Sequence, residues 1–127
     1  MDVFNSFATD EAVEVAGVWK DLDKDTSILV ARMENKEHTK LMIKLYEENI
    51  SKLEGNPELD DILTREILAK TILKGWKNLT YKGKTLKYSI DNAMMILSHK
   101  DFRKAVVKIA IDFDNFRMKL DEEDVKN

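Results

Sequence analysis

The sequence predicts an α+β fold that is mainly α-helical, with an N-terminal β-hairpin followed by about four helices. Three observations support this class. Residues alternate in polarity near the N-terminus, apolar residues recur at helical spacing from Asn35 onward, and apolar residues make up 43% of the 127. A chain of this size and composition can bury one hydrophobic core. We therefore expect a flexible N-terminal arm over residues 1–11, a single domain over residues 12–120 and an acidic tail over residues 121–127.

The first predicted element is a β-hairpin. Residues 12–20 place Val13, Val15 and Trp19 on one face, a period of two that is typical of a strand. Residues 27–33 are rich in β-branched and apolar side chains, which indicates a second strand. Because residues 21–25 between them are almost all charged, the two strands are expected to form a hairpin.

The turn of this hairpin contains three alternating aspartates, a pattern shared with calcium-binding loops. Counted from Asp21, the sixth position is Thr26 where such a loop needs glycine, and the twelfth is Arg32 where it needs glutamate. The sequence therefore predicts a solvated turn and no metal site there.

Two helices are expected next. Asn35 can cap the first, and Gly55 can end it. Asn56 and Pro57 form a second start signal, since Asn is a good N-cap and Pro is well tolerated at the first helical position. The second helix is expected to continue as far as Trp76. Because only two residues separate the helices, they should be antiparallel neighbours.

The remaining segments are a short hairpin or extended loop and two more helices. Gly83 lies in a Lys-Gly-Lys turn within residues 81–88, and Ser89 can cap a short helix over residues 90–97. A last helix is expected from about residue 101 to about residue 120, with apolar residues four and three apart on one face: Phe102, Val106, Ile109, Phe113, Phe116 and Leu120. Val107, Ala110 and Ile111 widen this face. The helix is either central or meets a partner on its second side, and in so small a domain we expect it to be central.

No pattern in the sequence indicates catalysis. His38 and His99 stand in no metal-binding motif, there is no cysteine, and the serines lack the context of a nucleophile elbow. We therefore expect no enzyme activity, no cofactor and no bound metal. No apolar stretch approaches the roughly 20 residues that span a bilayer. The formal charge of −3 argues against generic nucleic-acid binding.

A lysine cluster is the main electrostatic feature. It contains lysines 70, 74, 77, 82, 84 and 87, with no carboxylate between Glu66 and Asp91. A solvated helix face and hairpin is the favoured interpretation, and a docking surface for an acidic partner or nucleic acid is the alternative. Trp76 within the cluster suits the core better than a base-stacking platform. Met94 and Met95 suit an adaptable binding patch, although at least one should be core.

Several segments together resemble the tail assembly chaperones of tailed bacteriophages. The resemblance runs from about Asp10 to Arg117 and is carried by the following: Ala12 to Trp19, Val30-Ala31-Arg32, Gly75-Trp76-x-x-Leu79, Tyr88-Ser89-x-x-Asn92-Ala93, and Phe102-Arg103 to Phe116-Arg117. None of these segments is a catalytic signature, so the resemblance depends on their order and spacing. The chain is richer in lysine than many members of that group.

The resemblance implies a chaperone that acts in the host bacterial cytoplasm and is absent from the virion. It would bind and solubilise the tape measure protein and help to recruit tail tube subunits. Our hypothesis places the partner surface at Trp76, Lys82, Lys84, Lys87, Met94, Met95 and Ile111. A homo-oligomer and a frameshift-extended form stay open. The alternatives are a small virion structural protein of the tail or head–tail junction, and a nucleic-acid-binding regulator that uses the Lys70–Lys87 cluster.

Overall fold

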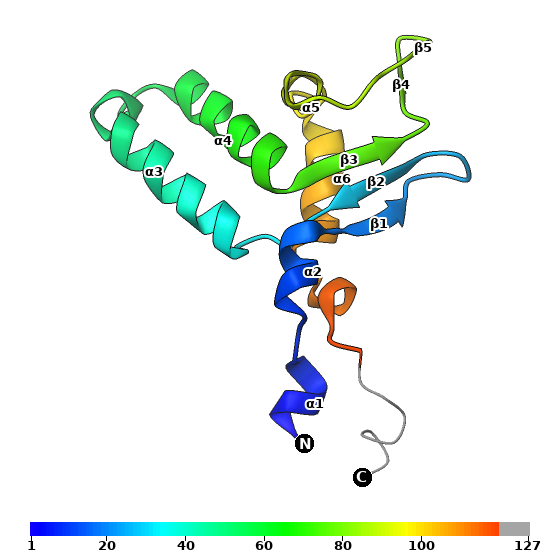
Figure 1. Cartoon of the computed structure of the whole chain (residues 1–127). Coiled ribbons are helices and arrows are strands. Elements are labelled where there is room, and N and C mark those ends of the chain that lie inside the picture. Colours follow the sequence, from blue (N-terminus) through cyan, green and yellow to red (C-terminus); the bar gives the residue numbers. More distant parts are fainter. Residues whose placement is uncertain (120–127) are drawn as a thin grey trace.

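A three-stranded antiparallel sheet joins an N-terminal segment to a set of helices in the computed structural model, which describes residues 1–119 (Figure 1). The elements are α1 (Val3–Phe7), α2 (Glu11–Ala16), β1 (Val18–Asp21), β2 (Ser27–Val30), α3 (Lys36–Leu53), α4 (Pro57–Thr71), β3 (Leu73–Lys77), β4 (Thr80–Tyr81), β5 (Lys84–Thr85), α5 (Ile90–Ile96), α6 (Lys100–Ala110) and the 3₁₀ helix η1 (Phe113–Phe116). The predicted fold class, α+β and mainly helical, is confirmed. Leu120 and the predicted acidic tail lie outside the described residues.

The N-terminal hairpin is present, but its first strand is shorter than predicted. Residues 11–16 form α2, because the Asp10 carboxylate caps this helix and accepts hydrogen bonds from the backbone N–H groups of Ala12 and Val13 at 3.0 and 3.3 Å. Gly17, at φ +94°, ends the helix and leads into β1. The prediction of a strand over residues 12–16 is therefore wrong. A capped first turn with two acidic residues overrides a short period-two pattern.

The end of the second predicted helix is instead the third strand. Helix α4 stops at Thr71, and β3 pairs with β2 so that Val30 lies opposite Leu73 and Ile28 opposite Trp76. The prediction of a helix as far as Trp76 is wrong. The β-branched pair before Leu73 and the glycine at position 75 weaken a helix there, and pairing with β2 buries the segment.

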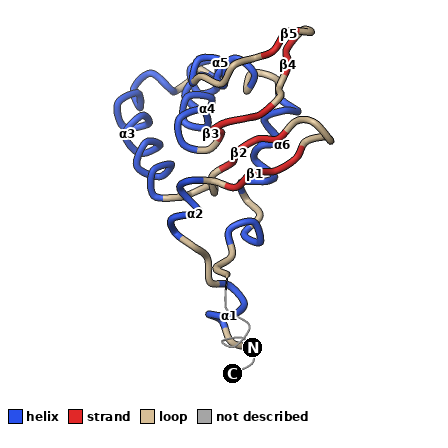
Figure 2. Tube along the Cα trace, turned by 45° about the vertical axis from the view of Figure 1, so that its right-hand side comes forward, coloured by secondary structure: helices blue, strands red, loops and turns tan. Residues whose placement is uncertain are grey.

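The α3–α4 pair agrees with the prediction. The Asn35 side chain accepts hydrogen bonds from the N–H groups of Glu37 and His38, and the Asn56 side chain accepts one from Leu59 at 3.1 Å. The two helices pack side by side as an antiparallel hairpin (Figures 1 and 2). The β4–β5 hairpin and the Ser89 cap of α5 also lie where the sequence predicts them.

The last helix is shorter than predicted. Helix α6 ends at Ala110, and η1 follows after a turn in which the Asp112 carboxylate accepts a hydrogen bond from Asp114 N–H at 3.1 Å. Asn115 donates to the Ile109 carbonyl at 3.0 Å. Short polar side chains of this kind compete with helical hydrogen bonds. The prediction of one continuous helix to residue 120 is therefore wrong for residues 111–119.

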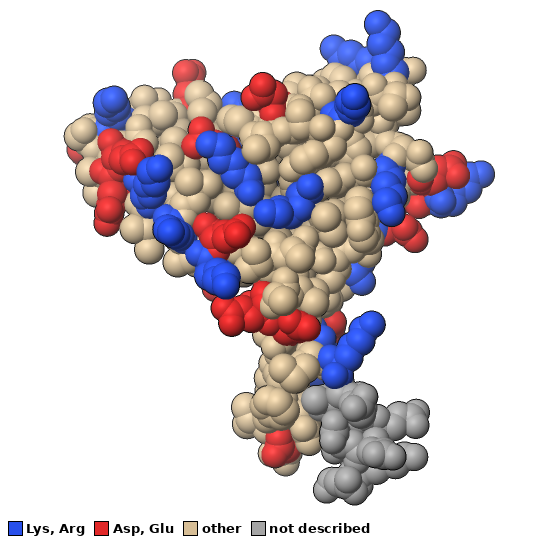
Figure 3. Space-filling model, viewed as in Figure 1, with Lys and Arg blue, Asp and Glu red and all other residues tan. Residues whose placement is uncertain are grey.

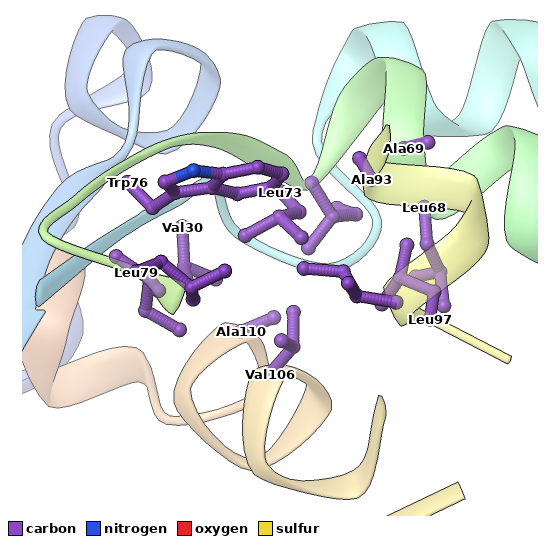
Figure 4. Close-up of a cluster of buried hydrophobic side chains, with 13 residues drawn as sticks. Val30, Leu68, Ala69, Leu73, Trp76, Leu79, Ala93, Leu97, Val106 and Ala110 are labelled. Atoms are coloured by element: carbon purple, nitrogen blue, oxygen red, sulfur yellow. The ribbon is translucent and has the colours of Figure 1, made fainter. Parts of the chain in front are cut away.

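The core lies between the sheet and helices α4, α5 and α6. Figure 4 shows Trp76 and Leu73 above Val106 and Ala110 of α6, with Leu97 and Leu68 closing one side. Of the residues that widen the apolar face of the last predicted helix, Ala110 is buried and Val107 packs half-buried against the core. Ile111, which follows the end of α6, is 63% exposed, so the expected cover on the second side stops at Ala110.

The flexible arm predicted over residues 1–11 contains α1 and the first residue of α2, and it lies beside the segment after α6 (Figures 1 and 2). Asp10 N–H donates to the Phe116 carbonyl at 2.9 Å, and Met118 N–H donates to the Ala8 carbonyl at 3.0 Å. The rings of Phe7 and Phe113 lie 5.6 Å apart. These contacts join the two ends of the described chain.

Candidate partner-binding groove between three helices

Trp76, the first of the predicted partner-binding residues, lies in the core. Its side chain is only 8% exposed, and its indole N–H donates to the Leu86 carbonyl at 2.7 Å. The Tyr88 ring packs edge-on against it at 4.8 Å between ring centroids. Trp76 therefore attaches the β4–β5 hairpin to the sheet and does not present its ring to a partner.

Lys82, Lys84 and Lys87 are exposed on the β4–β5 hairpin and the loop after it, and Figure 3 shows basic side chains projecting from this tip. The other lysines of the cluster contact groups of the chain itself. Lys70 lies 3.8 Å from Glu66 and Lys74 lies 3.6 Å from Glu37, while Lys77 stands 4.2 Å above the Trp19 ring. The cluster is thus divided between intramolecular contacts and a solvated tip, which favours the solvated interpretation.

The other three predicted residues do not form one surface with this tip. Met94 and Met95 are half-buried on α5 and pack against the core. Ile111 follows α6 at the end nearer the N-terminal segment, whereas the β4–β5 hairpin lies at the opposite end of the molecule in both ribbon views (Figures 1 and 2). The structure therefore separates Ile111 from the lysines with which the sequence hypothesis grouped it.

A different surface is hollowed and mostly apolar. It lies between α3, α4 and α6, has a volume of about 170 Å³, and is lined by Met33, His38, Met42, Tyr46, Thr64, Ile67, Leu68, Arg103 and Val107. We call it the three-helix groove. Helix α4 contributes the buried Ile67 and Leu68, which we call the floor, and the lining residues of α3 and α6 are called its walls. A second hollow of about 180 Å³, lined by Arg32, Met33, Glu34, Ala110 and Ile111, shares Met33 with the groove and extends it toward Ile111.

Both walls carry exposed apolar side chains. On α3, Ile43 and Ile50 are 50% and 72% exposed, and both are helix-surface neighbours of Tyr46 because they lie three and four residues from it. On α6, Ile111 lies four residues after Val107 and donates its N–H to the Val107 carbonyl at 2.9 Å. None of these isoleucines lines the groove, but each lies one helical turn from a residue that does, Tyr46 on α3 or Val107 on α6, and we call them the rims of the groove.

Backbone and side-chain hydrogen bonds hold the ends of the groove in place. At one end Met33 N–H donates to the Ala110 carbonyl at 2.9 Å, which ties the loop before α3 to α6. At the other end Arg103 donates to the Leu97 carbonyl at 2.8 Å and to Asp61 at 2.9 Å. The Arg103 hydrogen bond, assisted by Arg65, holds the pKa of Asp61 below its ordinary value. At the polar end the Asp61 carboxylate is thus paired with both Arg65 and Arg103.

His38, which stands in no metal-binding motif of the sequence, is one of the residues that line the groove. It is 7% exposed, and its Nδ1 accepts a hydrogen bond from Glu34 N–H at 3.2 Å. Burial lowers the pKa of His38, with Glu34 acting in the opposite direction. The ring is therefore neutral near pH 7, which keeps this part of the groove uncharged.

The sequence contained a partial signal for the groove. Met42 and Tyr46 fit the core stripe of α3, but Ile43 and Ile50 lie outside it and make the apolar face wider than one packed neighbour needs. The last predicted helix carried a signal as well, since Val107 and Ile111 widen its apolar face, but its sequence does not show that α3 and α4 lie opposite Val107.

Residues 1–119 contain no group of three or more His, Cys, Asp or Glu side chains arranged to hold a metal ion. None of the helices in this part of the chain is long and apolar enough to cross a membrane.

Comparison with known proteins identifies a phage-related family. The family described as YdaY prophage protein matches residues 30–127, a range that includes every residue lining the three-helix groove. Comparisons with curated proteins and with solved structures give no match. Since the match covers well over half of the chain, the protein belongs to the YdaY prophage protein family.

Proposed function

We propose that this prophage protein is a tail assembly chaperone that holds helical segments of the tape measure protein in the three-helix groove. The observation that carries the proposal is the groove itself, a mostly apolar hollow, together with three exposed isoleucines, Ile43, Ile50 and Ile111, that lie one helical turn from lining residues of α3 and α6. The membership of a prophage family and the resemblance to tail assembly chaperones supply the biological context.

The chemistry of the groove suits a helical client. An amphipathic helix binds a groove by inserting apolar residues that recur every three or four positions. Met33 and Met42 line the groove, and methionine side chains adapt to differently shaped neighbours because they are unbranched and flexible. A groove of this kind can therefore accept many related segments along one long helical client.

The task proposed for the groove requires release as well as binding. Interfaces well below about 1,200 Å² are typical of transient complexes. A chaperone must leave the tape measure protein when tail tube subunits polymerise around it, so weak contacts repeated along the client suit the task better than one tight contact. We propose that the protein acts in this way in the host bacterial cytoplasm, without catalysis and without a cofactor.

Co-expression with the tape measure protein of the same prophage tests the proposal. The wild-type chain should keep that protein in the soluble fraction. Ile50→Glu and Ile111→Glu should each lower the soluble yield several-fold, because they place a charge where an apolar client surface would bind. Both positions are exposed, so the fold should survive. Ile90→Glu, at an exposed position on α5, is the matched control and should leave the yield unchanged.

Equal precipitation of the tape measure protein with and without the wild-type chain would overturn the proposal. Two further measurements separate the alternative functions. Recovery of the protein from purified phage particles would indicate a virion component. Retention on DNA that falls steeply with salt would indicate a nucleic-acid-binding regulator.

A further inference from the structure

A row of lysines runs along the α6 wall of the three-helix groove. Lys100, Lys104 and Lys108 are spaced by four residues and are all exposed. Val107 lies three residues after Lys104, and Ile111 lies three after Lys108, so the row and the apolar wall share one side of the helix. Lys100 also lines a hollow that shares Arg103 with the groove. We call these three residues the α6 lysine row.

The charge of this row is not neutralised within residues 1–119. The ion pairs of this part of the chain include Arg103 of the same helix, which binds Asp61 at 2.9 Å, but none of the three lysines. Asp101 is the single carboxylate of α6. Across the groove, Glu34 lines the end near Ile111, and Glu47 is exposed on α3. On α6 itself the three lysines of the row outnumber Asp101, so the positive charge is confined to the α6 side, while Glu34 and Glu47 lie at the end of the groove and on α3.

From this arrangement, and resting on the proposed function, we infer that the client of the groove is an amphipathic helix with an acidic flank. Its apolar stripe would lie in the groove, and Asp or Glu residues spaced by four would face the α6 lysine row. The row spans eight residues, or about 12 Å of helix, so three acidic residues at matching spacing cover it in either chain direction. Lysine rather than arginine is well suited here, since a flexible point charge needs no fixed geometry.

This inference assigns different tasks to the two features. The apolar wall supplies the contact area, while the lysine row selects helices by charge and raises the rate of encounter. Each exposed ion pair contributes little to the binding free energy, so the row should lower the Kd for acidic-flanked helices by about tenfold rather than by several orders of magnitude.

Two synthetic helical peptides test the inference. They carry the same leucine stripe, and one has three glutamates at i, i+4, i+8 along one flank where the other has three lysines. The full-length protein should bind the glutamate peptide about tenfold more tightly at low salt, and the difference should shrink in about 1 M NaCl. Lys100→Gln, Lys104→Gln and Lys108→Gln together should abolish the preference, and the corresponding glutamate substitutions should reverse it.

A matched variant controls for net charge. Lys82→Glu, Lys84→Glu and Lys87→Glu change the charge equally, but on the β4–β5 hairpin and the loop after it, and should leave the preference for the glutamate peptide intact. Equal binding of the two peptides by the wild-type chain would overturn the inference, and so would a reversal caused by the hairpin variant.

The same set of measurements distinguishes this inference from the proposed function. If the wild-type chain keeps the tape measure protein soluble but shows no peptide preference, the acidic-flank inference fails alone. If the tape measure protein precipitates as it does without the chain, the proposed function fails, and the inference about its client fails with it.

Discussion

Trp76 shows how a residue that is prominent in the sequence can be structural. Its ring is buried between the sheet and α6, and its N–H bonds to Leu86 in the loop after β5. A tryptophan among lysines matches a pattern for stacking on bases, yet the pattern contains no information on burial. The residues that line the groove are the less conspicuous Met33, Met42 and Val107.

At the scale of single residues, we predict that Trp76→Phe destabilises the protein by about 1–2 kcal/mol, because the Leu86 carbonyl loses its hydrogen-bond donor and the smaller ring leaves space in the core. Chemical denaturation measures the loss. Trp19→Phe is the matched control, since Trp19 is 45% exposed on the edge strand β1, and its effect should stay within about 0.5 kcal/mol. Equal losses in the two variants would contradict the assignment of Trp76 to the core.

At the scale of elements, the junction between α2 and β1 depends on Gly17. Its φ of +94° is rare for residues with a side chain, and a Cβ placed there would meet the carbonyl carbon and oxygen of Val30 at 3.0 Å. Both contacts are with backbone, which cannot rotate away. The glycine therefore lets α2 pack directly against the end of β2.

We predict that Gly17→Ala destabilises the protein by about 2 kcal/mol or more, through backbone strain and the clash with Val30. Gly55→Ala is the comparison, because Gly55 also has a positive φ of +70° but its Cβ would meet nothing within 4 Å. That variant should cost only about 1 kcal/mol. Thermal unfolding of both variants checks which one loses more stability, and a larger loss of stability for Gly55→Ala would disprove this role of Gly17.

The elements that sequence reasoning predicted correctly are those with strong local signals. Asn35, Asn56 and Ser89 cap helices in the structure as predicted, because capping depends on a side chain and its nearest backbone neighbours. The predictions were wrong where contacts between residues far apart in the sequence determine the secondary structure. Strand β3 exists because β2 is available to pair with it, and α6 ends where the chain turns to reach α1.

The candidate site was harder to predict than the fold. Of the seven residues predicted for the partner surface, Ile111 borders the groove, and the structure places Trp76 in the core and the three lysines at the far end of the molecule. A groove between three helices depends on how those helices are placed in space. Spacing within each helix indicates which faces are apolar but does not indicate which faces meet.

At the scale of the whole molecule, the three-helix groove is formed by residues of the α3–α4 hairpin and of α6. The sheet lies beside α6, and the two ends of the described chain lie together at one end of the molecule (Figures 1 and 2). Charged side chains of both signs are scattered over the face shown in Figure 3, as expected for a chain with 35% charged residues. An apolar hollow with isoleucine rims differs from such a surface, and apolar patches of this kind commonly mark interaction sites.

The most direct test of the central claim is site-specific photo-crosslinking during co-expression with the tape measure protein. A photoreactive amino acid at position 43 or 111, on the two rims of the groove, should form a covalent adduct that contains the tape measure protein. The same amino acid at position 84 or 90, on the β4–β5 hairpin and on α5, should form none. Adducts from the second pair of positions and not from the first would contradict the account.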